Sequence, residues 1–276
     1  MNINTEPTLA QLLKSAQSEL KISSTPRLDA WVLLSFATKR PRHWLVANSS
    51  QKASDTMSSD ALSYFDYLVK IRSLGTPISL IIGSKEFYGI DFYVNKYTLT
   101  PRPESEAIVQ EVINSAPKNS KLLDVGTGAG AIAISVAIHR PDLDIFACDN
   151  SPKALEVARK NALHHQVDIK IQSSDLISLY KSDSFQIITA NLPYLPDSYS
   201  NKPDLQFEPT GALFGGADGL DIYRRLFEQL KDASSSTVIT EHLPSQKDAM
   251  DIIASTNHLQ FVKSLSDFCS VYSATQ

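Results

Sequence analysis

The sequence contains little glycine. Only ten of its 276 residues are glycine, which is well below the usual share for a globular protein. None precedes Gly75, none follows Gly219, and seven of the ten fall in two clusters, at residues 126–130 and 211–219. Glycine is needed where a backbone turns sharply or approaches a ligand closely. The two clusters therefore mark where special backbone geometry is expected.

Cysteine, histidine pairs and long apolar runs are also scarce or absent. Two cysteines, Cys148 and Cys269, cannot build a disulfide framework or a structural zinc site. The six histidines include no pair with metal-ligand spacing on a helix, so no metal is expected. No stretch approaches the ~18 apolar residues of a membrane span, and no signal peptide is visible at the start. We expect a cytoplasmic protein with no membrane partner.

Positive charge is not in surplus. Lysine and arginine number 26 against 30 aspartate and glutamate residues, which gives a formal net charge of −4. A broad basic surface for gripping nucleic acid is therefore unexpected, and no stable nucleic-acid partner is predicted. The length suggests about two domains.

The glycine-free first 74 residues predict a helical bundle. Apolar residues recur there at steps of three and four, the period of a helix. The predicted segments are residues 9–20, 27–37, 42–46 and 58–74. Gly75-Thr-Pro77 then breaks the pattern, and residues 78–94 have the composition of β-strands. We predict a helical domain at 1–74 and a β-hairpin linker at 75–104.

Residues 105–276 alternate between strand and helix patterns. This alternation predicts an α/β, Rossmann-like domain with a parallel sheet wrapped by helices. The predicted helices are 105–115, 131–139, 153–164, 220–231 and 246–255, and the predicted strands are 122–126, 144–149, 168–175, 184–194 and 236–243. A closing antiparallel pair is predicted at 261–267 and 269–276.

The first glycine cluster lies between a predicted strand and a predicted helix. Its loop consists of Gly126, Thr127, Gly128, Ala129 and Gly130. Free N–H groups at the start of the helix favour a nucleotide-type ligand. The pattern fits both a dinucleotide, whose fingerprint allows alanine last, and S-adenosylmethionine.

Four further residues, three acidic and one apolar, lie at or near the ends of predicted strands beside this loop. Asp149 is placed to accept hydrogen bonds from ribose hydroxyls. Asp124 is either an acceptor for a ligand ammonium or a cap on the glycine loop. Asp175 is placed to accept from the amino group of an adenine ring, and Leu176 to cover the face of that ring. The alternative is that Asp175 caps the next short helix.

Asn191-Leu192-Pro193-Tyr194 follows the fourth predicted strand. Pro193 favours an extended Leu192, which turns backbone carbonyls outward. The Asn191 side-chain oxygen and the Leu192 carbonyl can accept the two N–H bonds of a planar NH2 group and so aim its nitrogen, which suits methylation by placement. Tyr194 offers an aromatic face to a cation. The alternative is a surface β-turn.

Several motifs together resemble one family. They are Pro26–Ala30, Arg42–Leu45, Gly75–Pro77, Lys85–Phe87, Thr100–Glu106, Asp124–Ala131, Asn191–Tyr194, Phe207–Pro209, Ala212–Leu213, Gly215–Leu220, Tyr223–Arg224 and Glu241–His242. The chain resembles the protein-(glutamine-N5) methyltransferases of peptide chain release factors, the HemK family. Nearly the whole chain is covered.

The resemblance implies a fold, a reaction and a partner. The fold is a seven-stranded class I methyltransferase domain, preceded by a helical domain that docks the release factor. S-adenosylmethionine lies at residues 126–130, Asp149 and Asn191, and becomes S-adenosylhomocysteine. The glutamine of the Gly-Gly-Gln motif is received by residues 191–194, with Arg102 and Glu104 flanking the mouth, in support of translation termination.

The sequence departs from the family pattern and leaves alternatives. Leu192 replaces the usual proline, Leu243 replaces a glycine, and residues 267–270 lack a Gly-x-x-Arg stretch. The second glycine cluster, with Glu208, is a candidate lid. The alternative activities are N6-adenine or other nucleic-acid amino-methylation, nicotinamide-dependent oxidoreduction, and a binding module whose site has decayed.

Overall fold

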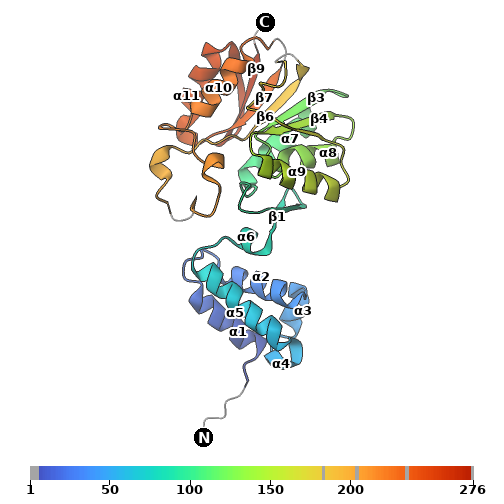
Figure 1. Cartoon of the computed structure of the whole chain (residues 1–276), viewed down its shortest axis with the longest axis vertical. Helices are drawn as coiled ribbons and strands as arrows, with labels where there is room; N and C mark the ends of the chain where they lie inside the picture. Colours follow the sequence, from blue (N-terminus) through green and yellow to red (C-terminus); the bar gives the residue numbers. More distant parts are fainter. Residues whose placement is uncertain (1–5, 182–183, 203–204, 234–235, 275–276) are drawn as a thin grey trace. The chain divides into compact units, whose positions relative to one another are not determined.

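The computed structural model describes residues 6–181, 184–202, 205–233 and 236–274. Predictions for residues 1–5 and 275–276 fall outside the described residues. The chain divides into two compact units, Met1–Gly83 and Ser84–Gln276, which Figure 1 draws in sequence colours. Each unit has its own hydrophobic core.

The first unit is helical, as the glycine-free pattern predicts. Its helices are α1 (Leu9–Glu19), α2 (Pro26–Thr38), α3 (Arg42–Ala47), α4 (Ala53–Thr56), α5 (Ser59–Ser73) and α6 (Ile78–Ile82). Thr8 and Gln11 form a capping box at the start of α1, and Ser58 caps α5. Asp29 of α2 and Arg72 of α5 form an ion pair of 2.7 Å, and both side chains are largely buried.

The prediction of β structure from residue 78 is wrong for the first five residues. Ile78–Ile82 is the helix α6, which follows Pro77 and ends at Gly83 with φ of 70°. A short apolar run has no periodicity that separates a strand from a helix. The hairpin itself is present in the second unit, as β1 (Ser84–Phe87) and β2 (Ile90–Tyr93). Tyr88 and Gly89 both have positive φ, as a two-residue hairpin turn of the right twist requires.

The second unit contains a sheet of seven strands in the order β5-β4-β3-β6-β7-β9-β8. Its strands are β3 (Lys121–Val125), β4 (Asp144–Asp149), β5 (Lys170–Ser173), β6 (Ile187–Ala190), β7 (Thr237–Glu241), β8 (Leu259–Ser266) and β9 (Cys269–Ala274). The first five of these are parallel. β9 pairs antiparallel with β7 and β8, which confirms the predicted closing pair.

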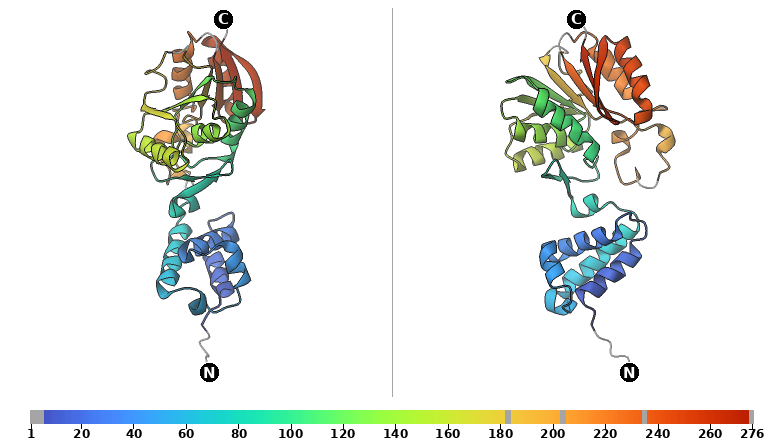
Figure 2. Two further views of the ribbon diagram at one scale, coloured as in Figure 1. Left: turned by 90° about the vertical axis from the view of Figure 1, so that its right-hand side faces the viewer. Right: turned by 180° about the vertical axis from the view of Figure 1, so that it is seen from behind.

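Helices cover both faces of the sheet, as Figures 1 and 2 show. One layer holds α7 (Glu106–Ser115), α8 (Ala131–His139) and α9 (Pro152–His164), and the other holds α10 (Asp221–Leu230) and α11 (Lys247–Thr256). Successive strand residues point to opposite faces, so Leu122 joins the first core cluster and Leu123 the second. Short 3-10 helices lie at Pro103–Ser105, Asp197–Tyr199, Thr210–Ala212 and Pro244–Gln246.

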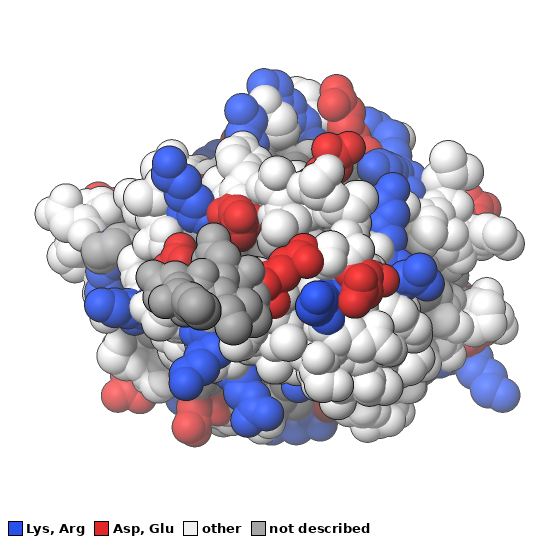
Figure 3. Space-filling model, turned by 90° about the horizontal axis from the view of Figure 1, so that it is seen from below, with Lys and Arg blue, Asp and Glu red and all other residues white. Residues whose placement is uncertain are grey.

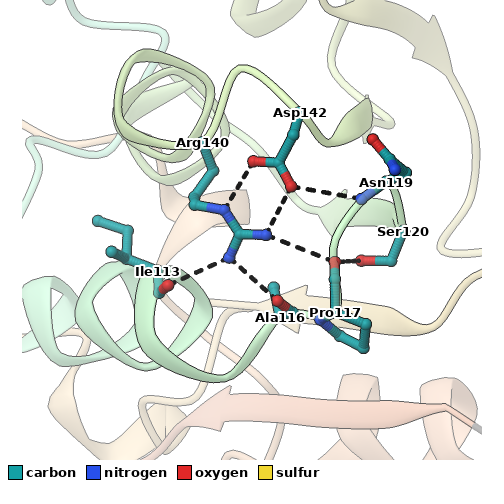
Figure 4. A network of polar contacts seen from close by, with 7 residues as sticks. All are labelled: Ile113, Ala116, Pro117, Asn119, Ser120, Arg140 and Asp142. Carbon is teal, nitrogen blue, oxygen red and sulfur yellow. Dashed lines mark hydrogen bonds and ion pairs between the residues drawn. The ribbon is translucent and has the colours of Figure 1, made fainter.

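A polar network joins the loops at the start of β3 and β4 (Figure 4). Arg140 donates to both oxygens of Asp142 at 2.7 Å. Its guanidinium also donates to the carbonyls of Ile113 and Ala116, each at 3.1 Å. One side chain therefore satisfies the carbonyls that end α7 and fixes the turn after α8.

β3 is the point where the strand order reverses, because the chain continues to β4 on one side and β6 lies on the other. In an open α/β sheet the ligand crevice lies at the carboxyl ends of the strands at this point. The strand predicted at 184–194 is shorter than expected, since β6 ends at Ala190. No helix in the described part of the chain has the length and apolar character needed to cross a membrane.

Candidate active site

A cavity of about 280 Å³ opens at the carboxyl ends of β3, β4 and β6. Its walls combine the glycine loop, the ends of the strands and the segment after β6. The predicted site residues that line it are Asp124, Gly126, Thr127, Gly128, Ala129, Asp149, Asp175, Leu176, Asn191, Leu192 and Pro193. The structure therefore brings together residues predicted at four separate points of the sequence.

All three glycines of the loop have positive φ, and at two of them a Cβ atom would also meet a close neighbour. Gly126 has φ of +72°, and a Cβ atom there would lie 2.7 Å from Cδ2 of Leu192. Gly130 has φ of +82°, and its Cβ would lie 2.8 Å from Cδ1 of Ile134. Gly130 is not among the lining residues. It allows the close packing that starts α8 at Ala131.

Asp149 organises the loop as well as facing the cavity. One carboxylate oxygen accepts from the Gly128 N–H at 2.9 Å, and the other accepts from the Ser151 N–H at 2.8 Å. Burial raises the pKa of Asp149, and these backbone donors oppose that shift. The Gly128 N–H is thus already paired with a carboxylate and does not face the cavity free to bind a phosphate.

Asp124 fits the capping interpretation and still lines the cavity. Its oxygens accept from the hydroxyls of Thr127 at 2.6 Å and Thr189 at 2.8 Å. Burial raises the pKa of Asp124 to about 6, against the lowering effect of the two hydroxyls. The group is therefore anionic above that pH, beside the space where a ligand would lie.

Asp175 and Leu176 continue the wall beyond β5. Asp175 forms an ion pair with Arg225, and both side chains are about half exposed. Leu176 is buried and has φ of 54°, a left-handed conformation that is costly for a residue other than glycine. Its carbonyl accepts from the Cys148 thiol at 3.3 Å.

The segment after β6 presents an unpaired acceptor. The Asn191 side chain donates through Nδ2 to Ser105 Oγ at 2.8 Å. Its Oδ1 is buried, and within the described residues it has no hydrogen-bond partner. The Leu192 N–H donates to the Tyr223 hydroxyl at 3.2 Å, so the leucine in place of proline gains a fixed hydrogen bond. Buried unpaired acceptors are uncommon, and this one belongs to a residue that lines the cavity.

The second glycine cluster packs directly against this segment. A Cβ on Gly215 would lie 2.5 Å from the Pro193 carbonyl, and one on Gly219 would overlap the Tyr194 carbonyl. Gln246 donates to that same Tyr194 carbonyl at 2.7 Å. These glycines support the segment from behind, whereas Gly211 lines the cavity.

Three of the residues predicted for substrate contact lie off the cavity wall. Tyr194, Arg102 and Glu104 are not among the lining residues, although their neighbours Pro193, Pro101 and Ser105 are. The Tyr194 hydroxyl donates to Glu241 at 2.8 Å. Burial raises the pKa of Tyr194. Arg102 pairs with the buried Glu208 instead of Glu104.

The charge of the lining suits a cation. It includes the carboxylates Asp124, Asp149 and Asp175, while Arg225 is the one cationic side chain among the described lining residues. Arg225 is itself paired with Asp175. Opposite charges attract most strongly in a partly enclosed site, so a positively charged ligand is favoured over a pyrophosphate.

Some supporting residues were not predicted from the sequence. Asn161 of α9 is fully buried and bonds the Ala129 carbonyl at 2.8 Å and both backbone groups of Tyr93. A lone amide on the apolar face of a predicted helix was the available signal. Ser105 and Glu241 stood out only as members of longer motifs, because nothing local in the sequence shows that they meet.

Comparisons of the fold agree with this site. The chain superposes on a methyltransferase from Pyrococcus furiosus with a TM-score of 0.52, over 68% of this chain and 91% of that one, at 15% identity. It also superposes on the Thermus thermophilus 16S rRNA N2 G1207 methyltransferase with a TM-score of 0.51, over 70% of this chain and 50% of that one, at 14% identity. The second unit therefore has the fold of a class I methyltransferase.

Comparisons of the sequence define the family. Residues 103–203 match the family model "Methyltransferase small domain", and residues 11–83 match "PrmC N-terminal domain". The chain is 34% identical to the release factor glutamine methyltransferase of Escherichia coli, over 86% of this chain and 87% of that one. It is likewise 34% identical to that of Neisseria gonorrhoeae, over 91% and 93%. The chain belongs to the release factor glutamine methyltransferase family.

Proposed function

We propose that this protein transfers a methyl group from S-adenosylmethionine to the side-chain amide nitrogen of the glutamine in the Gly-Gly-Gln motif of peptide chain release factors. The observation that carries the proposal is the buried Oδ1 of Asn191, which has no partner among the described residues and belongs to a residue that lines the cavity. An unpaired acceptor calls for a donor, and the NH2 group of a primary amide is a donor with two N–H bonds.

The residues present fit the cofactor. The three lining carboxylates favour a cation, and the space around Gly128 is open, since a Cβ there would meet nothing closer than 4.0 Å. S-adenosylmethionine, when bound, supplies a methyl group on a positively charged sulfur. The residues proposed to hold it are Asp124, Gly126, Thr127, Gly128, Ala129, Asp149, Asp175, Leu176 and Asn191, while Gly130, which does not line the cavity, shapes the loop. Within that set, Asp124 accepts from the ammonium and Asp149 from the ribose hydroxyls.

The segment at 191–194 holds the substrate amide. Oδ1 of Asn191 and the carbonyl of Leu192 accept its two N–H bonds, which leaves the nitrogen lone pair directed away from both acceptors. An amide nitrogen is a poor nucleophile, so placement supplies most of the rate gain. Pro193 and the packing of Gly215 and Gly219 against the segment keep it extended. The Tyr194 hydroxyl links it to Glu241 by a hydrogen bond.

The helical unit Met1–Gly83 docks the release factor in this proposal. Trp31, Phe36 and Tyr64 line a groove in that unit, together with Lys39 and Arg42. Phe36 and Tyr64 are exposed, and exposed aromatic side chains in a groove are suited to protein contacts.

A labelled-methyl assay tests the proposal. The protein is incubated with labelled S-adenosylmethionine and with either a release factor or bulk nucleic acid. We expect label on the release factor and none after a Gln→Ala change in its Gly-Gly-Gln motif. Label on nucleic acid alone would contradict the proposal and favour an amino-methyltransferase of nucleic acid.

A further inference from the structure

Asn191 is the first member of a chain of hydrogen bonds that leads into the protein. Its Nδ2 donates to Ser105 Oγ at 2.8 Å, and Ser105 Oγ donates to Glu241 Oε2 at 2.5 Å. The other oxygen of Glu241 accepts from the Tyr194 hydroxyl at 2.8 Å. Ser105 precedes α7 and Glu241 ends β7. Three distant parts of the sequence therefore meet in this series of hydrogen bonds.

Glu241 is an unusual residue for its surroundings. It is fully buried and Ser105 is 3% exposed. Within the described residues, no Lys, Arg or His forms an ion pair with Glu241. Burial raises its pKa, and the Ser105 and Tyr194 hydroxyls oppose that shift. A buried carboxylate is costly unless it is hydrogen-bonded, and the groups that stabilise this one are the two hydroxyls and, less strongly, the Asn191 side chain.

Each donor in this series of hydrogen bonds points toward Glu241. A carboxylate accepts and does not donate, and a serine hydroxyl has a single proton. Once Ser105 gives that proton to Glu241, only its lone pairs face Asn191. The NH2 end of the Asn191 amide can meet them, whereas a flipped amide would place Oδ1 against another acceptor. Oδ1 is thereby turned away from Ser105.

We propose that Glu241, acting through Ser105, is the positioning residue that fixes which end of the Asn191 amide is presented to the substrate. The inference rests on the proposed function. The substrate amide also has two ends, an NH2 donor and a carbonyl acceptor. Asn191 Oδ1 selects the NH2 end, whereas a flipped Asn191 would attract the carbonyl and hold the substrate with its nitrogen misplaced.

Two substitutions change the order of donors and acceptors between Asn191 and Glu241 in different ways. Ser105→Ala removes the acceptor of Asn191 Nδ2. Glu241→Gln keeps the shape but turns an NH2 group toward Ser105 while its oxygen stays with Tyr194. Ser105 then accepts from the introduced amide and gives its own proton to Asn191, which favours the flipped orientation of Asn191. Ser135→Ala is the matched control, because Ser135 is a fully buried serine of α8 whose hydroxyl has no partner among the described residues.

Methyl transfer to the release factor measures the effect. We expect each of Ser105→Ala and Glu241→Gln to lower kcat by about 10- to 100-fold, with no rise in KM and little change in S-adenosylmethionine affinity. Misplaced substrate still binds, so the loss falls on kcat. The double variant should be no slower than the slower single variant, because both changes act through the same amide. Ser135→Ala should match the wild type.

Three outcomes would overturn the inference. They are wild-type kcat in either single variant, losses that multiply in the double variant, and losses matched by an equal loss of cofactor affinity. Failure of the proposed function is a separate result, because it would show in the wild-type protein as absence of methyl on the glutamine.

Discussion

At the scale of single residues, the segment at 191–194 depends on one buried hydroxyl. Tyr223 is fully buried, and its hydroxyl meets the Leu192 N–H and the carbonyls of Ala190 and Glu241. The ends of β6 and β7 and the turn at residue 192 therefore share one polar atom. Leucine in place of the family's proline adds an N–H group, and Tyr223 is the residue that satisfies it.

Tyr223→Phe should lower the free energy of unfolding by about 1–3 kcal/mol, because it leaves buried backbone groups unpaired. Adding Leu192→Pro removes the N–H that lost its acceptor. We therefore expect Leu192→Pro to cost less stability in the Tyr223→Phe background than in the wild type. Denaturant midpoints of the four proteins provide the measurement, and strictly additive effects would contradict the shared role.

The affinity for S-adenosylmethionine should depend on pH through Asp124. Burial raises its pKa to about 6 from the ordinary 3.8, so below pH 6 the carboxyl becomes neutral and attracts an ammonium less. Affinity should therefore fall as the pH drops through 6, and Asp124→Asn should bind weakly with little of this pH dependence. Calorimetric titrations on both sides of pH 6 test this. An unchanged pH profile in Asp124→Asn would rule out the assigned role.

The same shift has a defined effect on stability. Between pH 3.8 and about 6 the folded protein holds a proton on Asp124 that the unfolded chain has lost. The Asp124 contribution therefore makes unfolding easier as the pH rises through this window.

At the scale of elements, local patterns were predictable and long-range contacts were not. The glycine loop, Asp149 and the strand before Asn191 follow from residues that are adjacent in sequence. Residues 78–82 were misassigned because a five-residue apolar run carries too little periodicity. The packing of Gly215 and Gly219 against residues 193–194 joins distant segments, and no spacing in the sequence reveals it.

The network around Arg140 gives a prediction for an element boundary. Its guanidinium bonds Asp142 and the carbonyls at the end of α7, so Arg140→Ala should lower the free energy of unfolding by about 2 kcal/mol. Affinity for S-adenosylmethionine should change little, because Arg140 is not among the residues that line the cavity.

The matched control for Arg140 is Arg159→Ala. Within the described residues Arg159 makes a single hydrogen bond, from an exposed guanidinium to the Ile171 carbonyl at 3.2 Å. Thermal unfolding should separate the two variants by several degrees. Equal stability would show that the Arg140 network contributes little.

At the scale of the whole molecule, the surface charge and the division into two units bear on which partner the protein binds. On the face drawn in Figure 3, lysine and arginine side chains are interspersed with aspartate and glutamate on a largely uncharged surface. This face and the net charge of −4 favour a protein partner over a long nucleic acid. The helical unit has its own core and its own groove, so the proposed docking role can be tested separately from the proposed chemistry.

The combined change Phe36→Ala and Tyr64→Ala tests the docking role. Both side chains are exposed and in contact with each other, so stability should change little. KM for the whole release factor should rise about tenfold or more, with kcat and the KM for a short Gly-Gly-Gln peptide unchanged. Leu163→Ala, at an 81% exposed position of α9, serves as the control. An unchanged KM for the release factor would place docking elsewhere.

In the proposed reaction, Asn191 presents its amide oxygen to the glutamine of the Gly-Gly-Gln motif. The most direct measurement is mass spectrometry of release-factor peptides after reaction with the wild type and with Asn191→Ala. We expect one added methyl on that glutamine with the wild type and none with Asn191→Ala, while the variant still binds S-adenosylmethionine. A methyl on another residue, or unchanged turnover in Asn191→Ala, would contradict it.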